Sequence, residues 1–516
     1  MTEEHDIVVN TALPATDEKS LESQFEKFRL NTVGYNHSYK TPFGLKSLIY
    51  ADWIASGRLY HPIEKIILES IGPFIGNTHT LTSENGRLMT EAYELAHQKI
   101  KSHVNAGIND VILTTGFGMT GAIVKFQRIL GMKSCGEIAH HACIKDSERP
   151  VVFVTHMEHH SNQTTWYETS ADVVVVDPGE DMLVALEKLE AALVKYKDRK
   201  RKIGSFTACS NVTGIRTPYY QMAKLMHKYD GVVFIDFAAS APYDDINMHP
   251  LDPDEKLDAV LFSPHKFLGG PGSSGVLIFD SSLYNNKTPD QPGGGTVDWT
   301  NPWGEYKFIE NIEVREDGGT PGFIQAIRTA LSLELKNMMG VDAIHRREKE
   351  LLNRAFPALR RIPGLHILAD SIEDRLGVIS FYIDSIHYNL IVRLLSDRFG
   401  IQVRGGCVCA GTYGHYLLNV TPAESKVITD KINRGDLSEK PGWVRLSIHP
   451  TLKDQELDFI LDAVAMIQRN HHKWGMDYVY DSNTNEFMYR GDFKDFLEVE
   501  SWFELDEVMD QFDKDN

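Results

Sequence analysis

The chain has 516 residues, of which 42% are hydrophobic and 24% are charged, and its formal net charge is −19. This length predicts more than one domain, and the composition is typical of a soluble globular protein. The negative charge argues against nucleic acid or an anionic membrane surface as a partner. No apolar run could span a bilayer and the acidic N-terminus lacks a signal-peptide pattern, so we expect a cytoplasmic protein without a membrane partner. Five cysteines are few and odd in number, which indicates free thiols.

Residues 1–45 are polar and mixed in pattern, which predicts an N-terminal arm. A large domain is expected over residues 46–330, with the alternative that its first part packs on a smaller domain. Here strand-like runs alternate with helical patterns, which favours an α/β fold with a mainly parallel, doubly wound sheet. The expected strands are 111–114, 151–154, 173–176, 204–208, 232–235, 258–262 and 276–279, and the expected helices include 88–104, 122–130, 182–196 and 220–229.

A second, smaller α/β domain is expected over residues 331–470. A long helical pattern over 324–358 leads into it. The pattern then predicts strands at 378–383, 401–403 and 443–448, with helices at 389–399 and 453–468. Residues 411–442 are expected to form a long polar connection, and 471–516 an acidic C-terminal extension.

Polar side chains follow four of the expected strands of the large domain. They are His159 in the segment Glu-His-His-Ser-Asn at 158–162, Asn211, Asp236 and Lys266. Each one alone is more often a turn or cap residue. Because ligands bind at the carboxyl ends of strands in such sheets, their joint placement predicts one site.

Lys266 lies in the segment Ser-Pro-His-Lys between two apolar runs, and a glycine-rich turn follows it. A lysine held between packed strands can have its pKa lowered by desolvation, which makes the amine nucleophilic. The alternative is an ordinary solvated lysine in a surface turn. A second turn, Gly118-Met119-Thr120, joins a strand to a helix, so its backbone N–H groups could bind a phosphate. Its spacing is neither that of a Walker A loop nor that of a Rossmann fingerprint.

These residues together fit pyridoxal phosphate, which needs a lysine amine, an acid at its pyridine nitrogen and donors for its phosphate. Lys266 would supply the amine and Asp236 the acid. The expected phosphate ligands are Ser263, His265 and the turn Gly118, Met119 and Thr120, and His159 is placed to stack on the ring.

The ordered set of motifs resembles the class V aminotransferase family of fold-type I pyridoxal phosphate enzymes, and within it the cysteine desulfurase and selenocysteine lyase branch. The resemblance covers roughly residues 45–470. The matching positions are 158–162, 210–214, Asp236, 263–266, Gly-Thr-Pro at 319–321, Val-Arg at 403–404, Cys-Ala at 409–410 and Arg-Leu-Ser at 445–447.

The resemblance implies a large domain with the parallel sheet, a smaller α/β domain and a homodimer. By position it implies these roles: Lys266 as the Schiff-base lysine, His159 as the ring-stacking histidine, Asp236 as the pyridinium partner, Asn211 near the phenolic oxygen, Thr320 reaching the phosphate across the dimer interface, and Arg445 and Arg404 for the substrate. A guanidinium suits a substrate carboxylate because it can bind it through two hydrogen bonds.

Cys409 stands where this branch carries its sulfur-accepting cysteine. The implied reaction releases sulfur or selenium from L-cysteine or selenocysteine and gives alanine and a Cys409 persulfide, with a sulfur-acceptor protein as a possible partner. Arg404 and Arg445 would favour the thiolate. Because Cys407 lies only two residues before Cys409, the sequence leaves open which of these two thiols reacts. The alternatives are amino-group transfer or epimerisation of another amino acid without a role for Cys409, and a non-enzymatic protein that retains the fold.

The chain departs from the family pattern in three places. Ala239 stands where the family often has Gln or His, the Cys407-Val-Cys409 arrangement is closer to molybdenum-cofactor sulfurases, and the 411–442 connection and the C-terminal extension are long. A metal alternative rests on a zone with His140, His141, Cys143, His156, His159 and His160. Its spacing after a strand lacks the helical face of a His-Glu-x-x-His site, so we predict no metal. Cys407 and Cys409 also lack the usual zinc-knuckle spacing.

Overall fold

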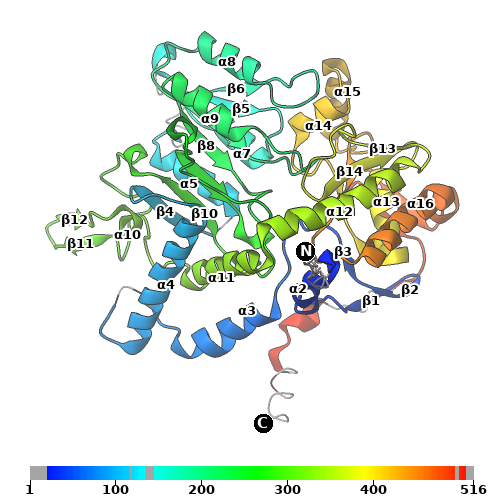
Figure 1. Ribbon diagram of the computed structural model, residues 1–516, viewed down its shortest axis with the longest axis horizontal. Helices are drawn as coiled ribbons and strands as arrows, with labels where there is room; N and C mark the ends of the chain where they lie inside the picture. The colour runs from blue at the N-terminus through cyan, green and yellow to red at the C-terminus, as the bar shows by residue number, and fades with distance from the viewer. Residues whose placement is uncertain are drawn as a thin grey trace, which may run out of the picture.

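The computed structural model describes residues 20–78, 80–116, 118–133, 145–493, 499–506 and 509. A seven-stranded sheet with the strand order β4-β10-β9-β8-β7-β5-β6 forms its larger unit (Figure 1). The strands are β4 (Asp110–Thr115), β5 (Val151–Thr155), β6 (Asp172–Val176), β7 (Lys202–Thr207), β8 (Val232–Asp236), β9 (Ala259–Phe262) and β10 (Gly275–Asp280). Strands β5 to β9 pair in parallel, and β10 is antiparallel to β9 and β4. The predicted α/β fold with a mainly parallel sheet is therefore confirmed.

Both faces of this sheet are covered by helices. In β5, Val151 and Phe153 belong to one apolar cluster, whereas Val152 and Val154 belong to the cluster on the opposite face. Parallel strands buried on both faces read as continuous apolar runs, which is why these strands could be found in the sequence. The covering helices are α4 (Glu84–His103), α8 (Leu186–Lys195), α9 (Tyr219–Lys228) and α11 (Phe323–Met339) on one face and α5 (Gly118–Ile129) and α7 (His160–Tyr167) on the other.

A smaller unit is built on a four-stranded antiparallel sheet of order β13-β14-β17-β16. Its elements are β13 (Leu365–Ile367), β14 (Val378–Ile383), β16 (Arg404–Gly406) and β17 (Trp443–Ser447), with α12 (Val341–Arg360), α13 (Tyr388–Leu394), the π-helical turn η7 (Leu395–Phe399) and α16 (Asp454–Gly475). Strand β15 (Ile401–Gln402) lies outside this sheet and pairs in parallel with β3 (Ile49–Tyr50). The first part of the chain therefore contacts the small unit.

The predicted continuous helix over 324–358 is wrong, because two helices occupy this stretch. They are α11 and α12, and the chain breaks between them at Gly340, whose φ is +79°. Glycine adopts this backbone conformation without the steric cost that other residues meet. The break lets α12 leave the large sheet and cross to the small unit (Figure 1).

The region 411–442, predicted as a long polar connection, includes two helices. It contains α14 (Gly411–Leu417) and α15 (Pro422–Ile432), and Thr421 and Glu424 form a capping box at the start of α15. Both helices are short, and although Tyr413 of α14 is buried in the apolar core, they lack the apolar periodicity by which longer helices are recognised. Tyr416 donates a hydrogen bond to Asp177, just after β6, at 2.9 Å. The segment therefore bridges the two units.

The predicted C-terminal extension is also partly packed. Helix α16 continues to Gly475, and a hairpin of β18 (Tyr478–Asp481) and β19 (Glu486–Tyr489) follows it. Tyr478 is buried in the apolar core of the small unit. Beyond this hairpin, η8 (Val499–Phe503) is described, whereas most of the acidic tail lies outside the described residues.

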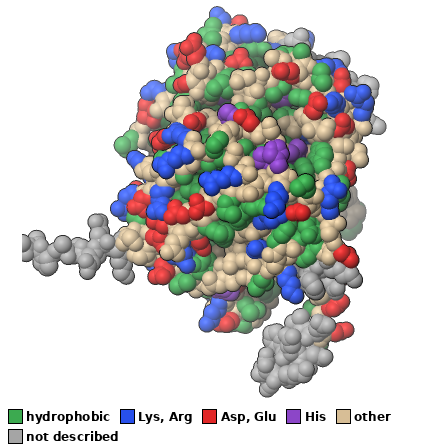
Figure 2. Space-filling model, turned by 90° about the vertical axis from the view of Figure 1, so that its right-hand side faces the viewer, with side chains coloured by type: hydrophobic (Ala, Val, Ile, Leu, Met, Phe, Trp, Pro, Cys, Tyr) green, Lys and Arg blue, Asp and Glu red, His purple; other side chains and the backbone are tan. Residues whose placement is uncertain are grey.

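The remaining elements are short and lie in the N-terminal segment, in connections of the large unit and around the β11–β12 hairpin. They are α1 (Leu21–Gln24), α2 (Glu26–Leu30), β1 (Ser38–Thr41), β2 (Gly44–Ser47), α3 (His61–Lys65), η1 (Ile66–Ile71), η2 (Gly72–Phe74), η3 (Asp146–Glu148), η4 (Pro253–Glu255), η5 (Pro264–Lys266), η6 (Ser281–Leu283), β11 (Val297–Thr300), β12 (Tyr306–Phe308) and α10 (Ile312–Arg315). Within the described ranges, no helix combines the length and hydrophobicity needed to cross a bilayer. On the face drawn in Figure 2, acidic and basic side chains are interspersed.

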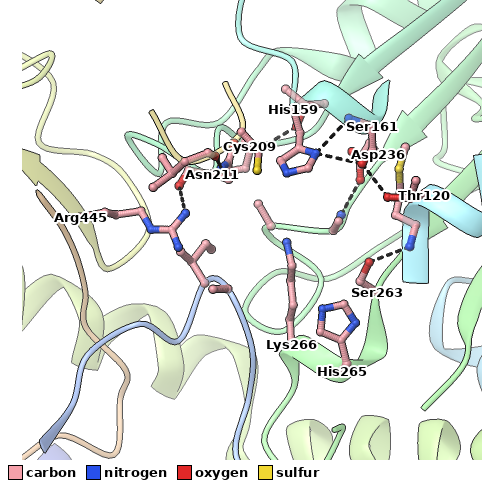
Figure 3. A pocket seen from close by; sticks show the side chains of 18 of the residues that line it. Thr120, His159, Ser161, Cys209, Asn211, Asp236, Ser263, His265, Lys266 and Arg445 are labelled. Atoms are coloured by element: carbon pink, nitrogen blue, oxygen red, sulfur yellow. Dashed lines mark hydrogen bonds between the residues drawn. The ribbon is translucent and has the colours of Figure 1, made fainter. Parts of the chain in front are cut away.

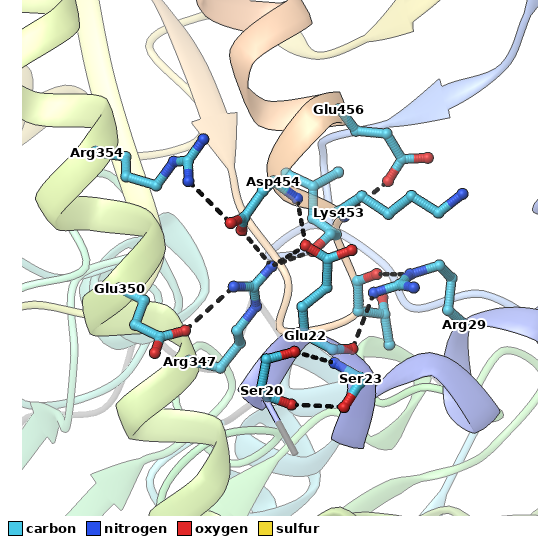
Figure 4. A network of polar contacts seen from close by, with 12 residues as sticks. Ser20, Glu22, Ser23, Arg29, Arg347, Glu350, Arg354, Lys453, Asp454 and Glu456 are labelled. Atoms are coloured by element: carbon cyan, nitrogen blue, oxygen red, sulfur yellow. Dashed lines mark hydrogen bonds and ion pairs between the residues drawn. The ribbon is translucent and has the colours of Figure 1, made fainter. Parts of the chain in front are cut away.

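Arg347 joins the N-terminal segment to α12 and α16 (Figure 4). Its guanidinium lies 2.8 Å from Asp454 and 3.7 Å from Glu22, and it donates to the Leu452 carbonyl at 2.8 Å. The Arg347 side chain is only 2% exposed. A cation with these partners is costly to remove, because the carboxylates then lose the charge that compensates their partial burial.

We therefore expect Arg347→Ala to lower the free energy of unfolding by about 3 kcal/mol. The matched control is Arg354→Ala, since Arg354 also contacts Asp454 at 2.8 Å but has a side chain that is 42% exposed. That change should cost about 1 kcal/mol or less. Urea unfolding followed by circular dichroism measures both. Equal losses in the two variants would contradict the stabilising role of Arg347.

Candidate functional site

A cavity of about 200 Å³ lies at the carboxyl ends of the parallel strands, where the two units meet (Figure 3). Eleven of the site residues predicted from the sequence line it: Met119, Thr120, His159, Asn211, Asp236, Ser263, His265, Lys266, Arg404, Cys409 and Arg445. Further lining residues that were not among the predicted site residues include Ile54, Ala55, Ser161, Thr207, Cys209 and Val408. The structure thus brings together side chains that are far apart in the chain.

Lys266 stands in the turn between β9 and β10, and close backbone packing fixes this turn. Gly57 donates its N–H to the His265 carbonyl at 2.9 Å, and a Cβ on Gly57 would lie 1.9 Å from the Phe267 carbonyl oxygen. A Cβ on Gly270 would lie equally close, 1.9 Å, to the Pro264 carbonyl oxygen. Burial lowers the pKa of Lys266 to about 8, although the Asp236 charge opposes this shift. An appreciable fraction of the amine is therefore neutral near neutral pH.

The turn before α5 approaches the same cavity. Gly118 has φ +58°, and a Cβ there would lie 3.0 Å from Ser263 Oγ and 3.2 Å from His265 Cε1. The Met119 N–H donates to Ser263 Oγ at 2.8 Å. Gly118 itself does not line the cavity, but its lack of a side chain allows Met119 and Thr120 to approach Ser263 and His265.

Asp236 ends β8, and its carboxylate accepts the Ala238 N–H at 2.8 Å. Burial raises the pKa of Asp236 to about 6. Glu158, from the Glu-His-His segment, lies outside the cavity. It accepts hydrogen bonds from Thr155 Oγ1 at 2.7 Å, Asn162 Nδ2 at 2.7 Å and the Thr207 N–H at 3.0 Å. Glu158 therefore connects β5, α7 and β7, so its carboxylate stabilises the fold of the large unit.

His159 is the N-cap residue of α7, and its Nδ1 accepts the Ser161 N–H at 3.1 Å. Burial lowers the pKa of His159 to about 3, so the ring is neutral at physiological pH. Because Nδ1 is an acceptor, the proton of the neutral ring is on Nε2. Thr120 Oγ1 lies 2.6 Å from Ser161 Oγ, which joins the start of α5 to the start of α7.

Arg445 is buried and paired with Asp52, a residue that was not among the predicted site residues. Its guanidinium donates to Asp52 Oδ1 at 2.7 Å and to the Asn211 carbonyl at 3.2 Å, while its Nε is buried without a partner. Arg404 donates to the other Asp52 oxygen at 3.0 Å. One carboxylate therefore bridges two arginines. The signal that could have identified Asp52 is its isolated charge within the apolar segment 48–54.

Cys409 is exposed and lines the cavity. Cys407 is partly buried and packs against the apolar core of the large unit, without lining the cavity. Cys209 lines the cavity but is buried, and burial raises the pKa of its thiol. Among the described cysteines, Cys409 alone is both accessible and in the cavity wall. Cys135 and Cys143 lie outside the described residues.

The family model described as Aminotransferase class-V matches residues 49–460. The chain belongs to the class V aminotransferase family. A probable cysteine desulfurase of Halalkalibacterium halodurans is 27% identical over 368 residues, which cover 70% of this chain and 84% of the relative. A probable cysteine desulfurase of Staphylococcus epidermidis is 28% identical over 370 residues, which cover 71% of this chain and 84% of the relative. The apo structure of a cysteine desulfurase from Thermococcus onnurineus superimposes with a TM-score of 0.69 at 21% identity, covering 86% of this chain and 98% of that one.

The family assignment and the structural likeness confirm the predicted fold-type I architecture and the prediction of an enzyme. Thr320, predicted as a phosphate ligand, is exposed in the loop before α11 and does not line the cavity of its own chain. Ala239, where the family often has Gln or His, is buried and lines the cavity. This side chain therefore offers the cavity no polar group.

The zone considered for a metal is only partly described. His156 directs its Nε2 to the Met182 carbonyl at 3.0 Å. Over the residues that the structure describes, no three His, Cys, Asp or Glu side chains are grouped so that they could hold a metal ion. His140, His141 and Cys143 lie outside these residues.

Proposed function

We propose that this chain is a pyridoxal phosphate-dependent cysteine desulfurase that forms a persulfide on Cys409, with L-cysteine or selenocysteine as substrate. The observation that carries this proposal is the exposed Cys409 in the wall of a cavity that also holds the buried Lys266 amine and the Arg445 guanidinium. The names of the relatives support the same activity.

Pyridoxal phosphate fits the residues of the cavity. Asn211 Oδ1 is buried there without a protein partner, which leaves an acceptor for the O–H of the cofactor's phenol group. The Lys266 amine would bind the cofactor's aldehyde carbon, the Asp236 carboxyl group would pair with its ring nitrogen, and the His159 ring would stack on its face. The phosphate would be held by Ser263, His265, Met119 and Thr120, which Gly118 allows to approach one another. When bound, the cofactor supplies an electron sink for negative charge on the substrate's α-carbon.

On the substrate side, Arg445 is placed to bind the carboxylate. Its unpartnered Nε leaves a donor available even while Asp52 is paired with the rest of the guanidinium. Arg404 is the second cation at this side of the cavity. Lys266 Nζ, whose pKa of about 8 allows proton exchange near neutral pH, is the group that we expect to take up the substrate's α-proton.

Cys409 then performs the sulfur transfer. The Cys409 sulfur, as thiolate, forms a bond to the substrate sulfur while the bond from that sulfur to the substrate's β-carbon breaks. The electron pair stays with the substrate, and its protonation gives alanine. The transferred sulfur remains on Cys409 as a persulfide at an exposed position. A sulfur-acceptor protein could therefore reach it.

A homodimer is part of the proposal. Thr320 is exposed and lies away from the cavity of its own chain, so it would serve the phosphate of a second copy. Large apolar side chains are exposed between α3 and α4 and on the β11–β12 hairpin, as expected of a surface that a partner covers. They are Ile66, Leu68, Phe74, Ile75, Leu81, Trp299, Trp303 and Tyr306.

The activity is tested by supplying the pyridoxal phosphate-loaded protein with L-cysteine and a thiol reductant and by measuring alanine and sulfide. Equal amounts of both products are expected. Alanine and aspartate, which lack the sulfur, should change the cofactor's absorption without releasing product. A keto acid formed from cysteine, without sulfide, would instead establish amino-group transfer and overturn the proposal.

Cofactor loading should depend on pH through Lys266. The neutral amine is the reactive form, so the rate of loading the cofactor-free protein should rise about tenfold per pH unit below the Lys266 pKa of about 8 and level off above it. Stopped-flow absorbance measures this rate. A rate that keeps rising to about pH 10, as for a solvated lysine, would contradict the lowered pKa.

A further inference from the structure

The Cys409 loop, residues 407–411, has a backbone that is unfavourable by itself. Val408 has φ +42° and Cys409 has φ +60°. Residues with a side chain rarely adopt this left-handed region, and a β-branched residue such as valine does so least readily. Such a conformation persists only where neighbouring groups hold it.

Three hydrogen bonds from the large unit hold the loop. Asn211 Nδ2 donates to the Val408 carbonyl at 2.8 Å. The His160 N–H donates to the Cys409 carbonyl at 2.8 Å, and the Gly411 N–H donates to His160 Nε2 at 2.9 Å. His160 therefore contacts the loop on both sides of Ala410, once through its backbone and once through its ring.

The ring contact of His160 depends on its close approach to Gly411. A Cβ on Gly411 would lie 3.2 Å from His160 Nε2, so a larger residue would crowd the ring. One residue further along, Thr412 Oγ1 donates to Gln163 Oε1 on α7 at 2.9 Å. The start of α14 is therefore aligned along the first turn of α7.

The two adjacent histidines must carry their protons on different nitrogens. Since the Gly411 N–H donates to Nε2 of His160, a neutral His160 ring has its proton on Nδ1. His159 has the opposite arrangement, because its Nδ1 is the acceptor. His159 lines the cofactor cavity, and the next residue fixes the loop that carries the nucleophile.

We propose that His160 is a positioning residue that holds the Cys409 sulfur at its place in the wall of the cofactor cavity. The proposal rests on the proposed function. Nucleophilic attack requires a narrow range of positions, and a displacement of about 1 Å can cost about 100-fold in rate. The His160 ring would act through the loop and would not touch the substrate.

The test compares His160→Ala with His160→Gln and with Glu168→Gln, an exposed change at the end of the same helix. In His160→Ala, the first-turnover rate of persulfide formation should fall at least about tenfold. The cofactor's absorption and the cysteine concentration that half-saturates its spectral change should remain as in the unchanged protein. The glutamine amide oxygen can accept the Gly411 N–H, so His160→Gln should recover most of the rate.

Hydrogen exchange of residues 408–412, followed by mass spectrometry, supplies a readout without turnover. His160→Ala should speed their exchange at least about tenfold, and Glu168→Gln should not. Unchanged exchange together with an unchanged persulfide rate would overturn the proposal. So would a parallel loss of cofactor and activity, which would mean that His160 only supports the cofactor site.

The proposed function and the role of His160 can fail separately. If the unchanged protein forms no persulfide from cysteine, the proposed function fails. Faster exchange of residues 408–412 in His160→Ala would then still support the anchoring of the loop, and unchanged exchange would refute it.

Discussion

Replacing Lys266 by alanine is expected to abolish the lysine-bound cofactor and to lower cysteine turnover by at least about 1,000-fold. Lys266 is the lysine of the cavity wall, and its buried amine has a pKa of about 8. The change removes both the attachment point of the cofactor and the expected proton acceptor. The measurements are the visible absorption of the purified protein and the release of alanine from cysteine.

Lys336 provides a matched control for this experiment. It is also buried, and burial lowers its pKa to about 8 as well. Lys336 Nζ lies 6.0 Å from the centroid of the Phe267 ring and donates to the Asp244 carbonyl, but Lys336 does not line the cavity. Lys336→Met should therefore retain the chromophore. A lysine-bound chromophore that persists in Lys266→Ala, or disappears equally in Lys336→Met, would contradict the assignment.

Cys409→Ser should lower sulfide release at least about 100-fold and leave cofactor binding unchanged. The exposed side chain contributes little to packing, so the fold should tolerate this change. L-cysteine should still alter the cofactor's absorption, because its carboxylate contacts and the lysine remain. The reaction then stops before the sulfur leaves the substrate. Absorbance spectra and sulfide measurement separate the two stages.

Cys407→Ser and Cys209→Ser are the controls for this prediction. Cys407 does not line the cavity and the Cys209 thiol is buried, so both variants should keep sulfide release within about threefold. If Cys407→Ser were as inactive as Cys409→Ser, the transfer would require both thiols, and Cys409 alone would not explain it. Full turnover by Cys409→Ser would exclude the persulfide on Cys409.

The site residues could be predicted where a buried strand ends in a polar residue. Asn211, Asp236 and Lys266 follow strands buried on both faces, and such strands are visible as apolar runs. Parallel pairing then brings their ends to one edge of the sheet. The same reasoning could not identify Asp52, because its site role depends on Arg404 and Arg445 from a distant part of the chain.

Local sequence patterns were less informative about the connections. The break at Gly340 lies within one continuous helical pattern, and only its positive φ shows that the chain turns there. Helices α14 and α15 are short: α14 buries Tyr413 in the core and joins the two units through hydrogen bonds such as Tyr416 to Asp177, whereas α15 buries no residue. Hydrophobic periodicity detects helices that pack on a core, and these helices give little of that signal.

The Glu-His-His segment shows how neighbouring residues of one motif divide between roles. Glu158 is hydrogen bonded within the large unit, His159 lines the cavity, and His160 contacts the Cys409 loop. The direction of each side chain depends on the start of α7 at His160, with His159 as its N-cap. The sequence could place this segment after a strand, but it could not distinguish the surroundings of the two histidines.

The central claim is that sulfur from cysteine is transferred to Cys409. It is tested most directly by incubating the cofactor-loaded protein with one equivalent of L-cysteine, without reductant, and identifying the modified peptide by mass spectrometry. We predict one added sulfur atom on Cys409, located by fragmentation of the peptide that contains both Cys407 and Cys409, together with one equivalent of alanine. Alanine formed without added sulfur on Cys409, or sulfur found on another cysteine of the chain, would contradict this claim.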